Sequence, residues 1–143
     1  MGGADQARPD QAWPLLRMAV ERAMDERPED PAGVAIVMRR VEGLLLDIAD
    51  LLARLNAARY DAEVTYTSVR NQAMAKAAGE GHSVTIARAL GEEKAVPERR
   101  AWDAQRVLFH YAEDTQRALA AKHYGLMNTQ RSLSSVLYEA GRR

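Results

Sequence analysis

A stripe of apolar residues between positions 34 and 62 constrains the fold of this chain more than any other feature. Its members follow one another in steps of three and four: Val34, Val37, Val41, Leu44, Ile48, Leu51, Leu55, Ala58 and Ala62. This is the a/d pattern of a coiled coil, held for four heptads. After a local phase slip it continues through Tyr66, Val69 and Ala73. The pattern predicts one helix from about Ala32 to Ala78, ended by Gly79-Glu80-Gly81 as expected of a C-terminal glycine.

A second long helix is predicted from about Pro97 to Ala140, with Gly141 at its end. Its inward positions are Trp102, Leu108 or Phe109, Ala112, Leu119, Leu126, Leu133 and Leu137. The two helices match in length, so a short tip at about 79–97 favours a long antiparallel, coiled-coil-like hairpin over residues 31–143. Within the tip, Ser83 is predicted to cap a stretch from Val84 to Leu90, closed by Gly91. If Ala78 meets Pro97, Tyr66 lies beside Phe109.

Residues 1–30 are predicted to form a flexible tail followed by a short amphipathic helix. The tail covers residues 1–9, and Asp10 is the expected N-cap of a helix that reaches about Arg27. Trp13, Leu16 and Val20 supply its apolar stripe. Asp30 before Pro31 is typical of an N-cap followed by a proline at the first helical position.

The first long helix has more apolar surface than one partner helix can cover. Leu44-Leu45-Leu46 and Leu51-Leu52 extend well beyond a two-residue stripe, and an uncovered stripe is costly in water. The short N-terminal helix could cover it as a third helix, or a second copy of the chain could, giving a four-helix dimer core. We expect both, and a homodimer in particular. The predicted oligomer or partner face is Leu45, Leu46, Leu52, Trp13 and Leu16.

Composition sets outer limits on the function. The 143 residues suit a single domain and are 47% hydrophobic and 28% charged, which is ordinary for a folded soluble protein. There is no cysteine, which excludes disulfides and thiolate chemistry. No apolar run approaches the ~20 residues that cross a bilayer, and residues 1–10 lack the apolar core of a secretion signal, so a cytoplasmic protein without membrane contact is expected.

The charge distribution leaves open an anionic partner for the second long helix. The net charge is zero, with 20 basic and 20 acidic residues, which argues against a free-standing duplex-DNA binder. From Thr115 onward, however, one acid, Glu139, stands against five basic residues: Arg117, Lys122, Arg131, Arg142 and Arg143. With the hydroxyl-rich run at 128–135 they could line a phosphate backbone. The ordinary alternative is a solvated helix face, and Tyr111, Tyr124 and Tyr138 are expected to pack rather than to stack on bases.

The candidates for catalysis and metal binding are few. His82, His110 and His123 share no metal-ligand spacing, and His110 with Asp114 has the geometry of a surface pair. The carboxylate pairs Asp47–Asp50 and Glu113–Asp114 lack the Glu-x-x-His partner of a di-metal bundle. No phosphate-binding glycine loop or nucleophile motif occurs. We therefore expect a non-enzymatic protein without cofactor or metal.

The second half of the chain resembles a known group of proteins. Three segments carry the likeness: Tyr60-Asp61-Ala62-Glu63, the run Ala95-Val96-Pro97-Glu98-Arg99-Arg100-Ala101-Trp102, and LMNTQRSLSSVLYE from Leu126 to Glu139. Over residues 57–142 the chain resembles small helical-hairpin accessory proteins of actinobacterial phages and prophages, often found among replication and recombination genes. The resemblance implies a phage or prophage accessory protein and brings no catalytic residues. Residues 1–56 have no such counterpart.

Two functions follow as expectations. The first is a non-enzymatic interaction or scaffold protein that binds a protein partner. The second is a recombination or replication accessory that binds single-stranded nucleic acid through the basic face of its last helix.

Overall fold

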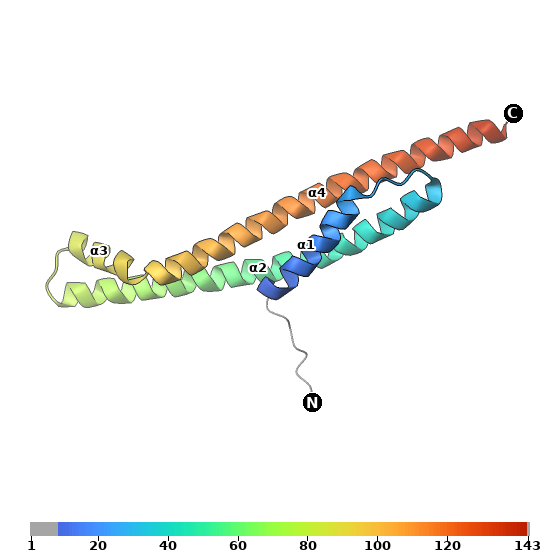
Figure 1. The fold of residues 1–143 in the computed structure, drawn as a ribbon. Helices are drawn as coiled ribbons and strands as arrows, with labels where there is room; N and C mark the ends of the chain where they lie inside the picture. The colour runs from blue at the N-terminus through green and yellow to red at the C-terminus, as the bar shows by residue number, and fades with distance from the viewer. Residues whose placement is uncertain (1–8, 143) are drawn as a thin grey trace. The chain divides into compact units, whose positions relative to one another are not determined.

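The computed structural model describes residues 9–142, which form four α-helices and no strand. The helices are α1 (Pro9–Asp25), α2 (Pro31–Gly79), α3 (Val84–Lys94) and α4 (Val96–Gly141), shown in Figure 1. The all-α class is thereby confirmed, and the two long helices have 49 and 46 residues. None of the described helices combines the length and the apolar character needed to span a membrane.

Local sequence signals set most helix ends where they were predicted. At the start of α2 the Asp30 carboxylate accepts a hydrogen bond from the backbone N–H of Gly33 at 2.7 Å, with Pro31 as first helical residue. At its end Gly81 has φ of 87°, a conformation that glycine adopts freely. The N–H groups of Gly81 and His82 then donate to the carbonyls of Ala78 and Ala77, each at 3.1 Å. These two bonds form a Schellman motif.

Three predicted positions near helix ends are corrected by the structure. Asp10 lies inside α1, which begins at Pro9, and α1 ends at Asp25 rather than at Arg27. Ser83 does cap α3, but Gly91 does not close it, because α3 continues to Lys94. Gly91 is instead a buried packing position inside the helix.

The chain forms two compact units, each described by itself. Unit 1 contains α1, the part of α2 up to Leu52 and the part of α4 from Ala112 onward. Unit 2 contains the part of α2 from Ala53, the whole of α3 and the part of α4 up to Tyr111. In each unit the α2 and α4 segments run antiparallel, as predicted for a hairpin (Figure 1).

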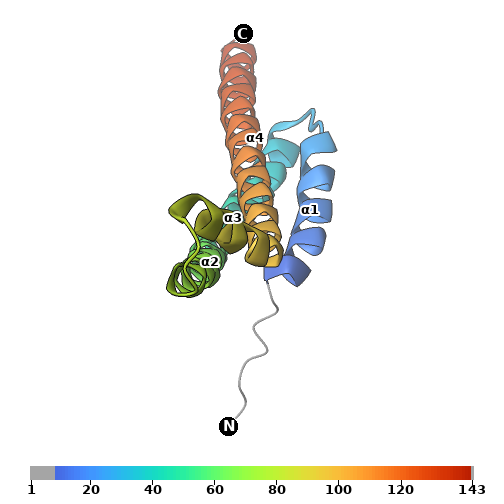
Figure 2. The ribbon, with the colours of Figure 1, turned by 90° about the vertical axis from the view of Figure 1, so that its left-hand side faces the viewer.

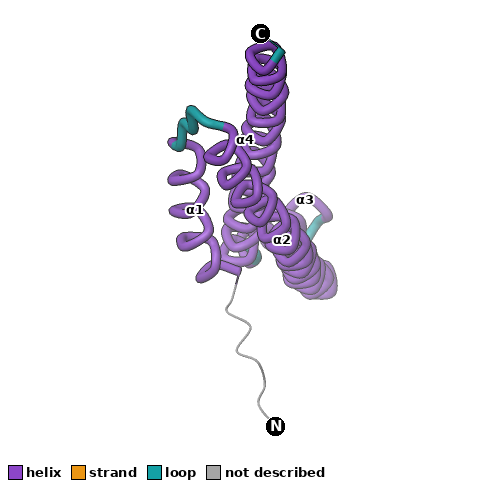
Figure 3. Tube along the Cα trace, turned by 90° about the vertical axis from the view of Figure 1, so that its right-hand side faces the viewer, coloured by secondary structure: helices purple, strands orange, loops and turns teal. Residues whose placement is uncertain are grey.

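Unit 1 is a three-helix arrangement in which α1 packs on the α2 and α4 segments (Figures 1 and 3). Ile48 and Leu119 are fully buried. The core gathers residues of all three helices: Val20, Ala23, Val34, Val37, Val41, Leu44, Ile48, Leu119 and Leu126. The predicted third helix is therefore supplied by the same chain.

Unit 2 has a different register from the one predicted. Tyr66 stacks on Trp102, with ring centroids 5.5 Å apart, and not on Phe109, which lies one heptad later on α4. Arg59 covers the Phe109 ring instead, at 4.6 Å. The reason is α3, which folds back along the end of α2, so that α4 begins opposite an earlier part of α2 (Figure 1); Figure 2 shows α3 beside α2 from the end of the helices.

Candidate interaction surfaces

Lys122, a predicted phosphate contact, is engaged within unit 1. Its ammonium donates to the backbone carbonyls of Met24 at 3.4 Å, in the last turn of α1, and of Glu26 at 2.5 Å, just beyond it. Burial lowers the pKa of Lys122, and the neighbouring Arg27 lowers it further. Carbonyls at a helix end attract cations, so Lys122 holds α1 against α4. Nearly one hundred residues of sequence separate Lys122 from these carbonyls, so no local sequence pattern predicts the contact.

Two of the other basic residues, Arg117 and Arg131, lie exposed on α4 in line with two tyrosines. Arg117, Tyr124, Arg131 and Tyr138 recur every seven residues and therefore share one helix face; we call them the Arg/Tyr stripe. Tyr124 and Tyr138 are 64% and 66% exposed, so the expectation that these rings pack was wrong. Arg117 pairs with Asp114 at 3.1 Å. Arg142 lies over the Tyr138 ring, and Arg143 falls outside the described residues.

The predicted partner face is mostly covered by the chain itself. Trp13 is buried, and three of the leucines, Leu16, Leu45 and Leu52, pack half-buried against the core of unit 1. Only Leu46 remains exposed, at 74%. Because packing within unit 1 already covers most of this surface, little of it is left for a second copy of the chain, and the homodimer stays a prediction.

The last turns of α4 carry a line of apolar side chains that is half-buried against the core at Leu133 and exposed beyond it. Leu133, Val136, Leu137 and Ala140 follow the i, i+3, i+4, i+7 spacing of one helix face, and we call them the α4 end stripe. Val136 and Leu137 are 62% and 61% exposed. The prediction that Leu137 points inward was wrong, because its side chain is exposed. In unit 1 the C-terminal part of α4 extends past the start of α2 (Figure 1).

A polar cluster in unit 2 joins all three of its helices at Glu92 of α3. The Tyr66 hydroxyl of α2 donates to Glu92 at 2.7 Å, and the guanidinium of Arg70 donates to it at 3.3 Å. Arg99 of α4 lies 3.8 Å from the same carboxylate. The Tyr66 hydrogen bond, and after it the charge of Arg70, lowers the pKa of Glu92. This cluster holds α3 in place.

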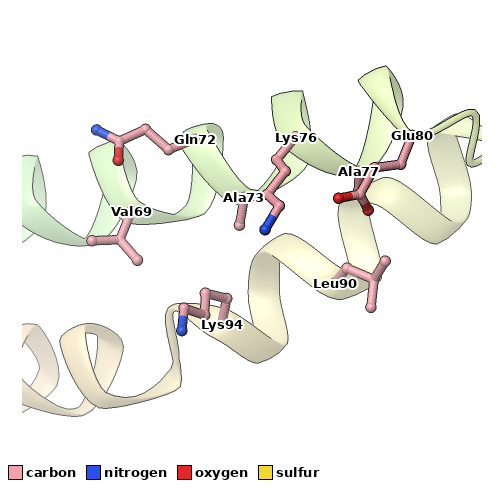
Figure 4. Close-up of a pocket in the computed structure, with 8 residues that line it drawn as sticks. All are labelled: Val69, Gln72, Ala73, Lys76, Ala77, Glu80, Leu90 and Lys94. Atoms are coloured by element: carbon pink, nitrogen blue, oxygen red, sulfur yellow. The ribbon is translucent and has the colours of Figure 1, made fainter.

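Beside this cluster, α2 and α3 enclose a groove of about 440 Å³ (Figure 4). Its apolar floor is made by Val69, Ala73, Ala77 and Leu90, and its polar rim by Gln72, Lys76, Glu80 and Lys94. In Figure 4 the Lys76 ammonium and the Glu80 carboxylate point into the space between the helices. Glu80 lies 4.0 Å from His82, whereas neither lysine has an ion-pair partner among the described residues. No pattern in the sequence predicts this groove, because its lining residues come from two helices.

His123 and Asp114, two of the residues that the sequence singled out, pair with residues outside the candidate catalytic and metal-binding sets. His123 contacts Glu42 at 2.9 Å, and Asp114 forms an ion pair with Arg117. Asp47 and Asp50 lie exposed on α2. Within residues 9–142 no three His, Asp or Glu side chains come together in a way that could hold a metal ion.

The chain was compared with known proteins, and no protein family, curated protein or solved structure matches it.

Proposed function

We propose that this protein is a non-enzymatic interaction protein that docks onto a protein partner through the α4 end stripe. The observation that carries the proposal is the exposure of Val136 and Leu137 on a continuous helix face. An amphipathic helix that lays i, i+3, i+4 and i+7 anchors into an apolar groove is a recurrent mode of protein recognition. The spacing of Leu133, Val136, Leu137 and Ala140 fits that mode.

The energetics favour a docked end of α4. Fully burying a Val or Leu side chain is worth about 1.5–3 kcal/mol, and Val136 and Leu137 leave more than half of this unrealised in unit 1. Each anchor is thus worth roughly a tenfold gain in affinity. A role as a phage or prophage accessory protein is part of the proposal, and it rests on the resemblance of residues 57–142 alone.

The test compares two Asp substitutions at exposed leucines of unit 1. Leu137→Asp removes an anchor, and Leu46→Asp places the same charge on α2, outside the stripe. We expect a partner retained from the native host extract by the wild-type protein and by Leu46→Asp, but not by Leu137→Asp. With that partner purified, Leu137→Asp should raise the Kd at least about tenfold. Equal retention by both variants would refute the proposed face.

A second candidate function is the binding of single-stranded nucleic acid along the Arg/Tyr stripe. Its specific support is the alternation of exposed Arg117, Tyr124, Arg131 and Tyr138 on one face. Arginines contact phosphates and exposed rings stack on bases, each stack contributing about 1–3 kcal/mol. Fluorescence anisotropy with a labelled oligothymidine at two salt concentrations tests it. Salt-dependent binding that falls in Arg131→Ala and Tyr124→Ala, but not in Leu137→Asp, would favour this function over protein docking.

A further inference from the structure

We infer that the groove between α2 and α3 binds an extended acidic peptide segment that carries one large apolar side chain. The groove lies in unit 2, so this inference is independent of the α4 end stripe. Three properties of the groove lead to it: its origin in small side chains, its length and its charge.

The groove exists because small residues, Gly91 among them, lie where α2 and α3 make contact. A Cβ atom at Gly91 would come within 2.9 Å of the Arg70 carbonyl oxygen, so the α3 backbone lies almost against α2 at that point. Farther along, Ala73 and Ala77 of α2 and Leu90 of α3 line the groove. Leu90 is 37% exposed, and Ala77 is buried. The floor therefore offers an apolar depression that a single larger side chain can fill.

The dimensions favour an extended chain as the occupant. The α2 wall runs from Val69 to Glu80, which corresponds to about 16 Å of helix at 1.5 Å per residue. An extended peptide rises about 3.3 Å per residue, so roughly five residues span the groove. One apolar side chain would enter the depression between Ala73 and Leu90, and its neighbours in sequence would lie along the rim.

The charge of the rim selects an acidic segment. Lys76 and Lys94 come from different helices, and neither has an ion-pair partner among the described residues of unit 2. Glu80, the single acid of the rim, lies 4.0 Å from His82, and lysines outnumber acids two to one on the rim. Carboxylates on either side of the apolar anchor would satisfy both ammonium groups, whereas a basic peptide would meet two like charges.

The experiment uses the full chain and a fluorescein-labelled peptide in which three aspartates flank one phenylalanine on each side. We expect saturable anisotropy with a Kd of about 10–100 μM, weakening with added salt. Lys76→Glu and Lys94→Glu should each raise the Kd about fivefold or more, and Lys76→Arg should preserve it. Arg88→Glu makes the same charge change elsewhere on α3 and should leave the Kd within about twofold.

Two peptide controls separate the groove from general attraction. A peptide with serine in place of the phenylalanine and a peptide with asparagines in place of the aspartates should both lose binding. The inference is overturned by no anisotropy change, by an equal effect of Arg88→Glu and Lys76→Glu, or by equal binding of the serine peptide. Leu137→Asp should bind the peptide as the wild type does, so a failure of the proposed docking face remains distinguishable from a failure here.

Discussion

Replacing Gly91 with alanine tests the packing of α3 on α2 most directly. The added Cβ would lie 2.4 Å from Cγ of Met74 and 2.9 Å from the carbonyl oxygen of Arg70. The Met74 side chain can rotate away, but the carbonyl belongs to the α2 backbone and cannot. The substitution therefore has to push α3 away from α2, which disturbs both the Glu92 cluster and the groove.

The expected magnitude follows from two opposing effects. Alanine is favoured over glycine in a helix interior by about 1 kcal/mol. Overpacking a close contact costs typically about 1–3 kcal/mol. Gly91→Ala should therefore lower the free energy of unfolding by up to about 2 kcal/mol. Gly43 of α2 and Gly125 of α4 have no atom within 4 Å of the equivalent Cβ position, so there the same change should stabilise by about 0.5–1 kcal/mol.

Urea denaturation followed by circular dichroism measures all three variants. The sign of the change is the decisive result, because the helix-propensity gain is common to the three sites. A second measurement, hydrogen exchange of the α3 amides, should show faster exchange in Gly91→Ala alone. If Gly91→Ala stabilises the protein as much as Gly125→Ala does, the close approach of α3 to α2 is refuted.

Three further predictions use the same measurements. Leu119→Ala should lower the free energy of unfolding by about 2–5 kcal/mol because the Leu119 side chain is fully buried. Leu137→Ala on the same helix should change it by less than about 0.5 kcal/mol because Leu137 is exposed, and similar values for the two variants would contradict this difference in burial. Lys122→Ala should speed amide hydrogen exchange in the last turn of α1 and lower the free energy of unfolding by about 1 kcal/mol. Unchanged exchange in that turn would show that the contacts to Met24 and Glu26 do not hold α1 in place. Because the pKa of Glu92 is lowered in the folded state, its contribution to stability is present above the ordinary glutamate pKa of about 4.3 and is lost as the pH falls through the folded value. Glu92→Gln should remove that part of the acid dependence, and an identical pH profile for the variant would refute the role of the cluster.

The helices and most of their ends could be predicted from the sequence because they depend on neighbours along the chain. The cap at Asp30, the glycine turn at Gly81 and the cap at Ser83 each involve residues within a few positions of one another. The apolar stripe of α2 was likewise readable, since helical periodicity alone decides which residues share a face. Val34, Val41, Ile48 and others of that stripe are buried as predicted.

The candidate surfaces were less predictable, because exposure depends on where other elements end. Leu137 and Leu119 occupy equivalent positions in one stripe, yet only Leu119 meets a facing helix. Tyr124 and Tyr138 were expected to pack against neighbours, and yet both side chains are more than 60% exposed. The sequence shows that the second half of α4 carries an excess of positive charge. It does not show that the Lys122 ammonium binds backbone carbonyls at the end of α1.

The sequence by itself therefore determined four helices, the caps at Asp30, Gly81 and Ser83, and the apolar stripe of α2. Only the tertiary structure decided the register of unit 2, where Tyr66 meets Trp102, and the covering of the α2 leucines by α1. It also placed Gly91 against α2 and so created the groove beside Lys76. The physical reason is that hydrogen bonds within a helix join near neighbours, whereas packing joins residues tens of positions apart, and several registers satisfy the same heptad pattern equally well.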